Sequence, residues 1–409
     1  MPLKPEIGWL ILVTDIFAKY AGLKAAAAGL TAKSPRNPFG VVIDHPVSAT
    51  VGLIEGRETL LFGTNNYLGL SQSRAAAEAA IETVRREGVG TTGSRIANGT
   101  YALHRKLEAH LAEVFRRRHC MIFSTGYQAN LGAISALAGK DDILLLDADS
   151  HASIYDASRL GYAQVIRFRH NDPADLDKRL SRLKDHQGAK LVVVEGIYSM
   201  TGNVAPMREF AEVKKKHGAY LLADEAHSFG VLGENGRGVA ERDGCEDDVD
   251  FVVGTFSKSL GTVGGYCVSN LEGLELIRLC SRPYMFTASL PPEIIASTLA
   301  ALDEMQARPE LRKQLYANAE QLNHGLHKLG LKTSPHVSPV VAVTLETVEQ
   351  ALAFWNRLLE LGVYVNLSLP PATPDEHPLL RCSVMAVHTA QEIDKALAAF
   401  AQAKAEILG

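Results

Sequence analysis

The segment 250–261, DFVVGTFSKSLG, places a single lysine among small hydroxylic residues. Its apolar residues 251–253 predict a buried strand that ends at Gly254, and Lys258 follows in the loop. A lysine in such a loop is either a solvated turn residue or an amine kept reactive by desolvation for Schiff-base chemistry. The segment alone favours the turn residue, because lysines are usually exposed, so the rest of the chain has to decide.

Two other predicted strands end in residues that could take part in such chemistry. Asp224 stands where the apolar run 221–223 stops, and His227 follows three residues later. His151 follows the predicted strand 143–146. Each residue also has an ordinary interpretation, because the aspartate could cap a helix and the histidines could be core or surface residues.

Residues 124–130 predict a turn from a strand into a helix. Free amides around Gly126 and Tyr127 could hold an anion such as phosphate there, although the glycine could also serve only a tight turn. Thr255 and Ser257 add two hydroxyl groups beside the lysine.

An amine, a carboxylate that keeps a pyridine nitrogen protonated, and a phosphate cradle are the parts that pyridoxal phosphate requires. In open α/β sheets, ligands bind beyond the carboxyl ends of the strands. Four predicted strand ends carry these parts independently. The sequence therefore predicts one cofactor site around Lys258 rather than four unrelated structural residues.

The elements between residues 65 and 305 alternate as strands and helices or loops. Continuous apolar strands are typical of a largely parallel sheet with both faces covered, so we expect an α/β fold with a mostly parallel seven-stranded sheet. Residues 1–64 predict a helix and a hairpin, and residues 306–409 a smaller α+β domain with a Pro-rich loop at 369–378. The seven strands are predicted at 121–123, 143–146, 164–168, 191–194, 220–222, 251–253 and 266–268, and helices at 74–86, 104–115, 310–329, 348–361 and 390–407.

The composition excludes several classes of protein. A formal net charge of -4 gives no electrostatic footprint for nucleic acid. The five cysteines include no Cys-x-x-Cys pair, which favours reduced thiols in a cytoplasmic protein over disulfides or a metal site. The glycines of 88–93, GVGTTG, follow a predicted helix rather than a strand, so they are not a dinucleotide fingerprint.

Apolar residues recur at helical spacing near the N-terminus, from residues 7–13 through Ile16, Phe17, Tyr20 and Leu23. No apolar run in the sequence reaches the length of a membrane span. We interpret the stripe as a helix face packed in the core. The alternative is a peripheral contact with the inner membrane or with a partner.

The motif set resembles the α-oxoamine synthases, which are fold-type I pyridoxal phosphate enzymes. The resemblance extends from NNYLGL at 65–70 to Leu380 and Arg381, and so covers nearly the whole chain. It is carried by TGY at 125–127, DSH at 149–151, DEAHS at 224–228, GTFSK at 254–258 and GG at 264–265.

The resemblance implies a role for each candidate residue. Lys258 would carry the cofactor through a Schiff base and then act as the base at the substrate Cα, and Asp224 would pair with the pyridinium nitrogen. His151 would stack on the ring and orient the substrate carboxylate, and His227 would approach the ring oxygen. The phosphate would be bound by Gly126, Tyr127, Thr255, Ser257 and, from a partner subunit, Thr287, and the substrate by Asn66, His151 and Arg381.

Within the family, the chain is most similar to the bacterial members that condense L-serine with a long-chain acyl-CoA. The segments that carry this finer resemblance are 90–100, 146–156, 168–171, 282–292 and 370–374. They imply a decarboxylating Claisen-type condensation by a homodimer with its active sites at the interface. Three alternatives stay open from the sequence: another amino acid or acyl donor within the family, a non-catalytic partner subunit, and a simple aminotransferase.

Overall fold

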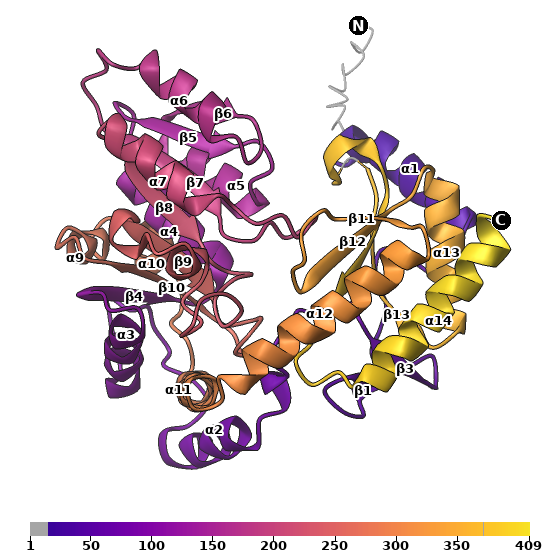
Figure 1. The fold of residues 1–409 in the computed structure, drawn as a ribbon. Coiled ribbons are helices and arrows are strands. Elements are labelled where there is room, and N and C mark those ends of the chain that lie inside the picture. The colour runs from indigo at the N-terminus through magenta and orange to yellow at the C-terminus, as the bar shows by residue number, and fades with distance from the viewer. Residues whose placement is uncertain (1–14, 371) are drawn as a thin grey trace, which may run out of the picture.

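The computed structural model describes residues 15–370 and 372–409, which form two lobes (Figure 1). The larger lobe is built on a seven-stranded sheet. Strand β10 is antiparallel to both of its neighbours, and the other adjacent strands are parallel. All seven predicted strands and the mostly parallel sheet are confirmed. In sheet order the strands are β4 (His119–Phe123), β10 (Gly265–Ser269), β9 (Phe251–Thr255), β8 (Tyr220–Asp224), β7 (Lys190–Glu195), β5 (Ile143–Asp147) and β6 (Gln164–Phe168).

Apolar strands make this sheet the centre of the larger lobe. Every residue of β5, β9 and β10 is buried, because helices and loops cover both faces of the sheet. Two separate apolar clusters result, one on each face. The helices of this lobe are α2 (Arg74–Glu87), α3 (Ala102–Val114), α4 (Gly126–Leu137), α5 (Ala152–Gly161), α6 (Pro173–Ser181), α7 (Met207–Lys216), α8 (Val239–Arg242), α9 (Leu274–Ile277), α10 (Arg282–Met285) and α11 (Pro292–Ala307).

The smaller lobe contains an antiparallel sheet in the order β11 (Lys332–Thr333), β12 (Val340–Thr344), β15 (Leu379–Ser383), β14 (Asn366–Ser368). Three helices pack with it: α12 (Glu310–Lys328), α13 (Val348–Glu360) and α14 (Ala390–Ile407). Capping boxes begin α13 and α14, since Thr347 and Thr389 each pair with the residue three positions later. The long helix α12 runs from the larger lobe along the smaller one (Figure 1).

The N-terminal hairpin joins the smaller lobe. Its strands are β1 (His45–Pro46), β2 (Val51–Ile54) and β3 (Arg57–Leu61), and β3 pairs in parallel with β13 (Val363–Tyr364). Two segments about 300 residues apart in the sequence therefore share one sheet. The boundaries predicted at residues 64 and 305 stay predictions.

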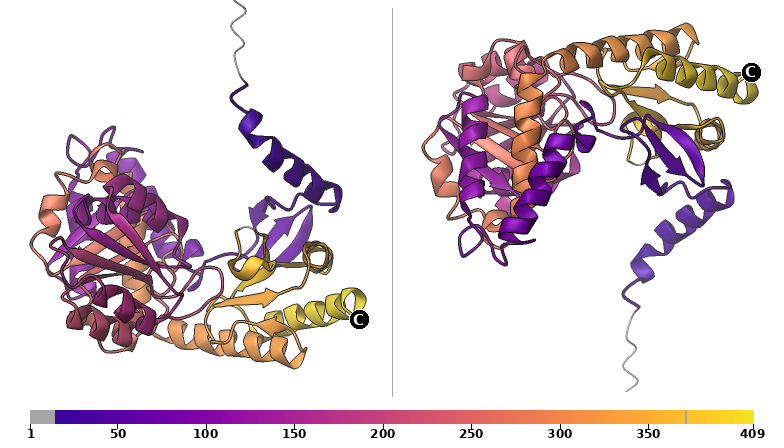
Figure 2. Two further views of the ribbon diagram at one scale, coloured as in Figure 1. Left: turned by 90° about the horizontal axis from the view of Figure 1, so that it is seen from above. Right: turned by 90° about the horizontal axis from the view of Figure 1, so that it is seen from below.

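Helix α1 (Ala21–Ala32) lies against neither core. It contains no buried residue, and Figure 2 shows it extending away from the lobes. Ile16, Phe17 and Leu23 are 69%, 71% and 68% exposed. The expectation that this stripe packs in the core is therefore wrong for these residues, while residues 7–13 lie outside the described part. Among the described residues, no helix is both long enough and apolar enough to cross a membrane.

Candidate active site

A cavity of about 280 Å³ opens at the carboxyl ends of the central strands. Its lining contains eight of the nine residues predicted to bind the cofactor, and the ninth, Thr287, lies elsewhere. Because these eight come from four strand ends and their following loops, the fold brings the predicted parts together. The cavity is lined by Thr125, Gly126, Tyr127, Asn130, His151, Ser153, Glu195, Asp224, Ala226, His227, Gly254, Thr255, Ser257, Lys258, Val263 and Gly264.

The N-terminus of α4 forms one wall of the cavity. Thr125 caps the helix by accepting a hydrogen bond from the Gln128 amide at 3.1 Å. The amides of Gly126 and Tyr127 have no partner within the helix, so they are free to bind an anion. A Cβ on Gly126 would lie 2.7 Å from the Thr255 Cβ, so only glycine allows this approach of α4 to β9. Tyr127 is 42% exposed at the rim.

Thr255 and Ser257 complete this wall. The Thr255 hydroxyl donates to the Gly264 carbonyl at 2.8 Å and lies 2.9 Å from Ser257 Oγ. These bonds fix two hydroxyl groups opposite the start of α4. The wall therefore has the amides and hydroxyls that a phosphate group requires.

Asn130 connects the buried carboxylate of Asp224 to the exposed histidine of the site. Its Nδ2 donates to Asp224 Oδ2 at 2.7 Å and to Ser153 Oγ at 2.9 Å. The Ser153 amide donates to His151 Nδ1 at 3.2 Å, which orients the ring over the cavity. Asp224 Oδ1 accepts from the Ala226 amide at 2.9 Å. Asp224 is thus held as an acceptor beneath the cavity.

Lys258 is half-buried between this carboxylate and the α4 wall. Burial lowers the pKa of Lys258 to about 8, although the negative charges of Asp224 and Glu195 oppose the shift. The lysine is therefore neutral for part of the time near neutral pH, as a nucleophilic amine must be.

Glu195 is a second carboxyl group in the lining. Its Oε1 accepts from the His151 amide at 2.5 Å, and it pairs in register with Asp224 on the neighbouring strand. Burial, with the charge of Asp224 added, raises the pKa of Glu195 well above its usual range. Two carboxyl groups, Glu195 and Asp224, therefore lie side by side on neighbouring strands in the cavity lining.

Of the predicted substrate residues, His151 lines the cavity, whereas Asn66 and Arg381 lie outside its lining. Arg381 is buried, and its Nη1 donates to Asn65 Oδ1 at 3.0 Å and to Ser383 Oγ at 2.9 Å. The Asn66 side chain bonds instead to Ser71, at 2.8 Å. Asn65, rather than Asn66, is therefore the asparagine in contact with the predicted carboxylate-binding arginine.

Thr287 contacts α4 from the segment that follows α10. Its hydroxyl accepts a hydrogen bond from Gln128 Nε2 at 3.1 Å, and Ser124 Oγ donates to the next carbonyl, Ala288 O, at 2.6 Å. The segment thus lies directly behind the phosphate wall. The role of Thr287 in a partner subunit's site stays a prediction.

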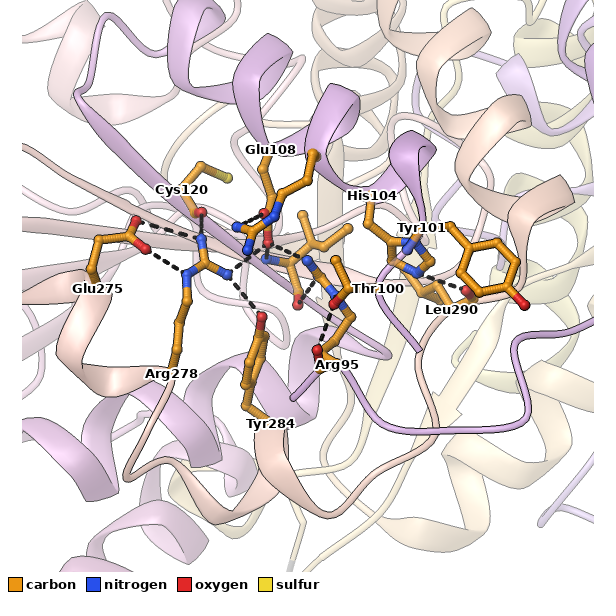
Figure 3. Close-up of polar contacts among 12 residues, drawn as sticks. Arg95, Thr100, Tyr101, His104, Glu108, Cys120, Glu275, Arg278, Tyr284 and Leu290 are labelled. Carbon is orange, nitrogen blue, oxygen red and sulfur yellow. Dashed lines mark hydrogen bonds and ion pairs between the residues drawn. The ribbon is translucent and has the colours of Figure 1, made fainter. Parts of the chain in front are cut away.

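A buried ion-pair network fixes this segment to the sheet (Figure 3). Glu108 Oε1 lies 3.0 Å from Arg95 Nη2 and 2.9 Å from Arg278 Nη1. Arg278 also donates to the hydroxyl of Tyr284 in α10 at 2.8 Å, and His104 Nε2 lies 3.0 Å from the carbonyl at position 290. The network connects α3, β4, the loop 88–100 and the segment 282–290, which includes α10.

Comparison with known proteins identifies the family. The aminotransferase class I and II family matches residues 57–400. Serine palmitoyltransferase of Caulobacter vibrioides is 58% identical over 90% of this chain and 91% of its own length. The 8-amino-7-oxononanoate synthase of Geotalea daltonii is 38% identical over 85% of this chain and 89% of its own. The chain belongs to the α-oxoamine synthase family.

Solved structures of the family share the whole fold. Sphingomonas wittichii serine palmitoyltransferase superposes with a TM-score of 0.94 at 48% identity, covering 96% of this chain and 99% of its own. A structure of SPT with a PLP internal aldimine gives the same TM-score at 47% identity and the same coverage. The α/β fold and the family predicted from the motifs are thereby confirmed.

The site fits the family's cofactor, pyridoxal phosphate. The close contact of Gly126 with Thr255 leaves a cradle of free amides and hydroxyls for a phosphate. Asp224 can accept from a pyridinium nitrogen, and the partly neutral Lys258 can attack an aldehyde. Among the described residues, no cluster could hold a metal ion.

Three residues of the site were missed from the sequence. Glu195 ends the apolar run of β7, so the strand-end argument that selected Asp224 would also have found it. Asn130 lies in the buried face of α4 among alanines and an isoleucine, where an amide needs a polar partner. Asn65 carries no signal that separates it from Asn66.

Proposed function

We propose that the chain condenses L-serine with a long-chain acyl-CoA, palmitoyl-CoA, to give 3-ketodihydrosphingosine, the first step of sphingolipid synthesis. The observation that carries the chemistry is the half-buried Lys258, which faces Asp224 and the α4 N-terminus in one cavity. The choice of substrates is supported by the serine palmitoyltransferase of Caulobacter vibrioides, at 58% identity.

Different residues of the site would bind different parts of the cofactor. Lys258 Nζ would hold the aldehyde carbon, Asp224 the ring nitrogen, and the α4 amides with Thr255 and Ser257 the phosphate. When bound, pyridoxal phosphate supplies a ring that accepts the electron pair left on the serine Cα after loss of a proton or of carbon dioxide.

Lys258 Nζ then acts as the base that removes the proton from the serine Cα. Its lowered pKa, about 8, suits a group that must accept and return a proton near neutral pH. His151 lines the same cavity and its Nδ1 accepts from Ser153, so its Nε2 would be available to orient the serine carboxylate. Hydrogen bonds to the Ser199 carbonyl, Asn65 and Ser383 hold the Arg381 guanidinium in place, and this group would be the second donor for the same carboxylate.

The reaction balances without an oxidant or reductant. The serine Cα forms a bond to the thioester carbonyl carbon, and CoA leaves as the thiolate. The carboxylate of the resulting β-keto acid leaves as carbon dioxide, and the Cα takes up a proton. Positioning both carbon centres in one closed site supplies much of the barrier reduction, because it replaces a bimolecular encounter. The loop 369–378 precedes Arg381 and would close over the site when the acyl donor binds.

We further propose a cytoplasmic homodimer with Thr287 reaching the partner's phosphate site. The five unpaired cysteines support a reducing compartment. The exposed apolar side chains of Ile16, Phe17, Tyr20 and Leu23 support a peripheral contact, either with the membrane or with the partner subunit. Deleting residues 1–33 and comparing membrane partition and oligomeric state would separate these contacts.

A substrate panel tests the proposed function. The purified protein would be supplied with pyridoxal phosphate and with serine, alanine or glycine against acyl-CoA thioesters of different length and acyl carrier protein thioesters. We expect serine with palmitoyl-CoA to give the highest kcat/KM. Glycine or alanine as the best donor, or a short acyl group as the best acceptor, would instead assign another condensation of the family. Amino transfer to 2-oxoglutarate would refute the condensation itself.

A further inference from the structure

A buried tyrosine, in the segment that joins the two lobes, contacts a histidine that lines the cavity. Tyr67 has no exposed surface, and its hydroxyl lies 2.6 Å from His227 Nδ1. Its backbone carbonyl accepts a hydrogen bond of 2.7 Å from the Ala386 amide of the smaller lobe. The phenol is therefore held in place from both lobes, and its single polar contact with the cavity lining is His227.

The direction of this hydrogen bond follows from the neighbouring groups. Both partners are neutral, because burial raises the pKa of Tyr67 and lowers the pKa of His227 well below its usual range. The other acceptor near the phenol, Asn65 Oδ1, lies farther away at 3.4 Å and already accepts from Arg381 at 3.0 Å. A separation of 2.6 Å is typical of an O–H donor, whereas N–H donors prefer about 2.9 Å. The hydroxyl of Tyr67 therefore donates to Nδ1.

A neutral imidazole that accepts at Nδ1 carries its proton on Nε2. His227 Nε2 makes no hydrogen bond to the described residues, and the residue lines the cavity. We propose that Tyr67 is a positioning residue that fixes His227 as the Nε2–H tautomer and so aims one neutral donor at the ring oxygen of pyridoxal phosphate. This inference rests on the proposed cofactor but not on the choice of serine or palmitoyl-CoA.

The same short segment also holds the substrate end of the site. Asn65, two residues before Tyr67, accepts from Arg381, so residues 65–67 fix one donor for the cofactor and one for the substrate carboxylate. The position of Tyr67 depends on the smaller lobe through Ala386. A shift of that lobe would therefore change the histidine donor and the arginine donor together.

The direct test reads the tautomer of His227 in the protein without added cofactor. Nitrogen-15 NMR of histidine-labelled protein, assigned with His227→Asn, distinguishes a protonated Nε2 from a protonated Nδ1. We expect the Nε2–H form in the wild type and a mixture of the two tautomers in Tyr67→Phe. A protonated Nδ1 in the wild type, or an unchanged spectrum in Tyr67→Phe, would overturn the inference.

A second measurement follows the cofactor. We expect Tyr67→Phe to bind pyridoxal phosphate about tenfold more weakly and to change the ratio of its two visible and near-ultraviolet absorption bands, as the loss of a residue that orients a ligand-binding histidine does. Tyr266→Phe is the matched control, because its buried hydroxyl makes no hydrogen bond to the described residues and its removal should leave both readouts unchanged. Unchanged affinity and band ratio in Tyr67→Phe would count against the proposal.

A double-mutant cycle shows whether Tyr67 acts through His227. Adding Tyr67→Phe to His227→Asn should cause no further loss of cofactor affinity, whereas independent losses that multiply would refute the positioning role. If the wild type showed no cofactor absorbance, the proposed function would be refuted instead. The nitrogen-15 NMR spectrum of the cofactor-free protein would still show which tautomer His227 adopts.

Discussion

Replacing Gly126 with alanine should weaken the binding of the cofactor phosphate. The added Cβ would lie 2.7 Å from the Thr255 Cβ and 2.9 Å from Thr255 Oγ1. Carbon atoms in contact prefer about 3.5–4.0 Å, so α4 and β9 must separate by roughly 1 Å or Thr255 must rotate. Rotation would break the 2.8 Å bond from Thr255 to the Gly264 carbonyl.

Either response displaces the phosphate wall. Overpacking of this kind costs about 1–3 kcal/mol. If this free energy must be spent when the cofactor binds, cofactor affinity falls about 5- to 150-fold, since about 1.4 kcal/mol corresponds to a factor of ten. Titration of cofactor-free protein, followed by visible absorbance, measures the change. Gly273→Ala is the control, because its Cβ would meet nothing within 4 Å.

A comparison of two ligands isolates the phosphate. Gly126→Ala should lose affinity for pyridoxal phosphate and keep its weak affinity for pyridoxal, which lacks the phosphate group. Wild-type affinity for pyridoxal phosphate would show that the start of α4 does not bind it. An equal loss for both ligands would show that the substitution disturbs the site as a whole.

Three further predictions concern the lysine, the interface and the buried network. Because the pKa of Lys258 is lowered to about 8, the rate at which cofactor-free protein reacts with pyridoxal phosphate should rise with pH up to about 8 and then level off; a rise that continues beyond pH 10 would indicate an ordinary lysine. Thr287→Val should lower cofactor affinity. In a mixed dimer with Lys258→Ala, the site that keeps Lys258 receives an intact Thr287 from its partner, so the affinity of that site should be restored. If the affinity is not restored, Thr287 does not belong to the partner's site. Glu108→Gln should lower the free energy of unfolding by about 3 kcal/mol in thermal or urea unfolding, because Arg95 and Arg278 lose their buried partner. Arg105→Ala removes a 60% exposed partner of the same carboxylate, so it should change the free energy of unfolding by less than about 0.5 kcal/mol. Equal effects of the two substitutions would contradict this account.

Much of the larger lobe could be predicted because its strands are uninterrupted apolar runs. Segments such as 143–146 and 251–253 can be buried on both faces only in a covered sheet, and this placed Asp224, His151 and Lys258 at one edge. The direction of β10 was not predicted, since an apolar run of three residues such as 266–268 is equally compatible with a parallel or an antiparallel pair.

Features that depend on tertiary contacts could not be read from the sequence. The pairing of β3 with β13 joins segments about 300 residues apart, and strands of two or three residues such as β1 and β14 carry little periodicity. The apolar spacing predicted one helix through Ile16, Phe17, Tyr20 and Leu23, whereas α1 begins only at Ala21 after a 3-10 turn at Ala18–Tyr20. The spacing also said nothing about what covers these residues. Asn65 and Asn66 differ only in where the chain turns, so the contact with Arg381 required the structure.

Release of labelled carbon dioxide from carboxyl-labelled L-serine tests the central claim most directly. The account predicts release that requires both pyridoxal phosphate and palmitoyl-CoA, occurs in proportion to the long-chain product, and is absent in Lys258→Ala. Product formation with the label retained would contradict the decarboxylating condensation. Release that persists in Lys258→Ala would contradict the role of the lysine around which the site is built.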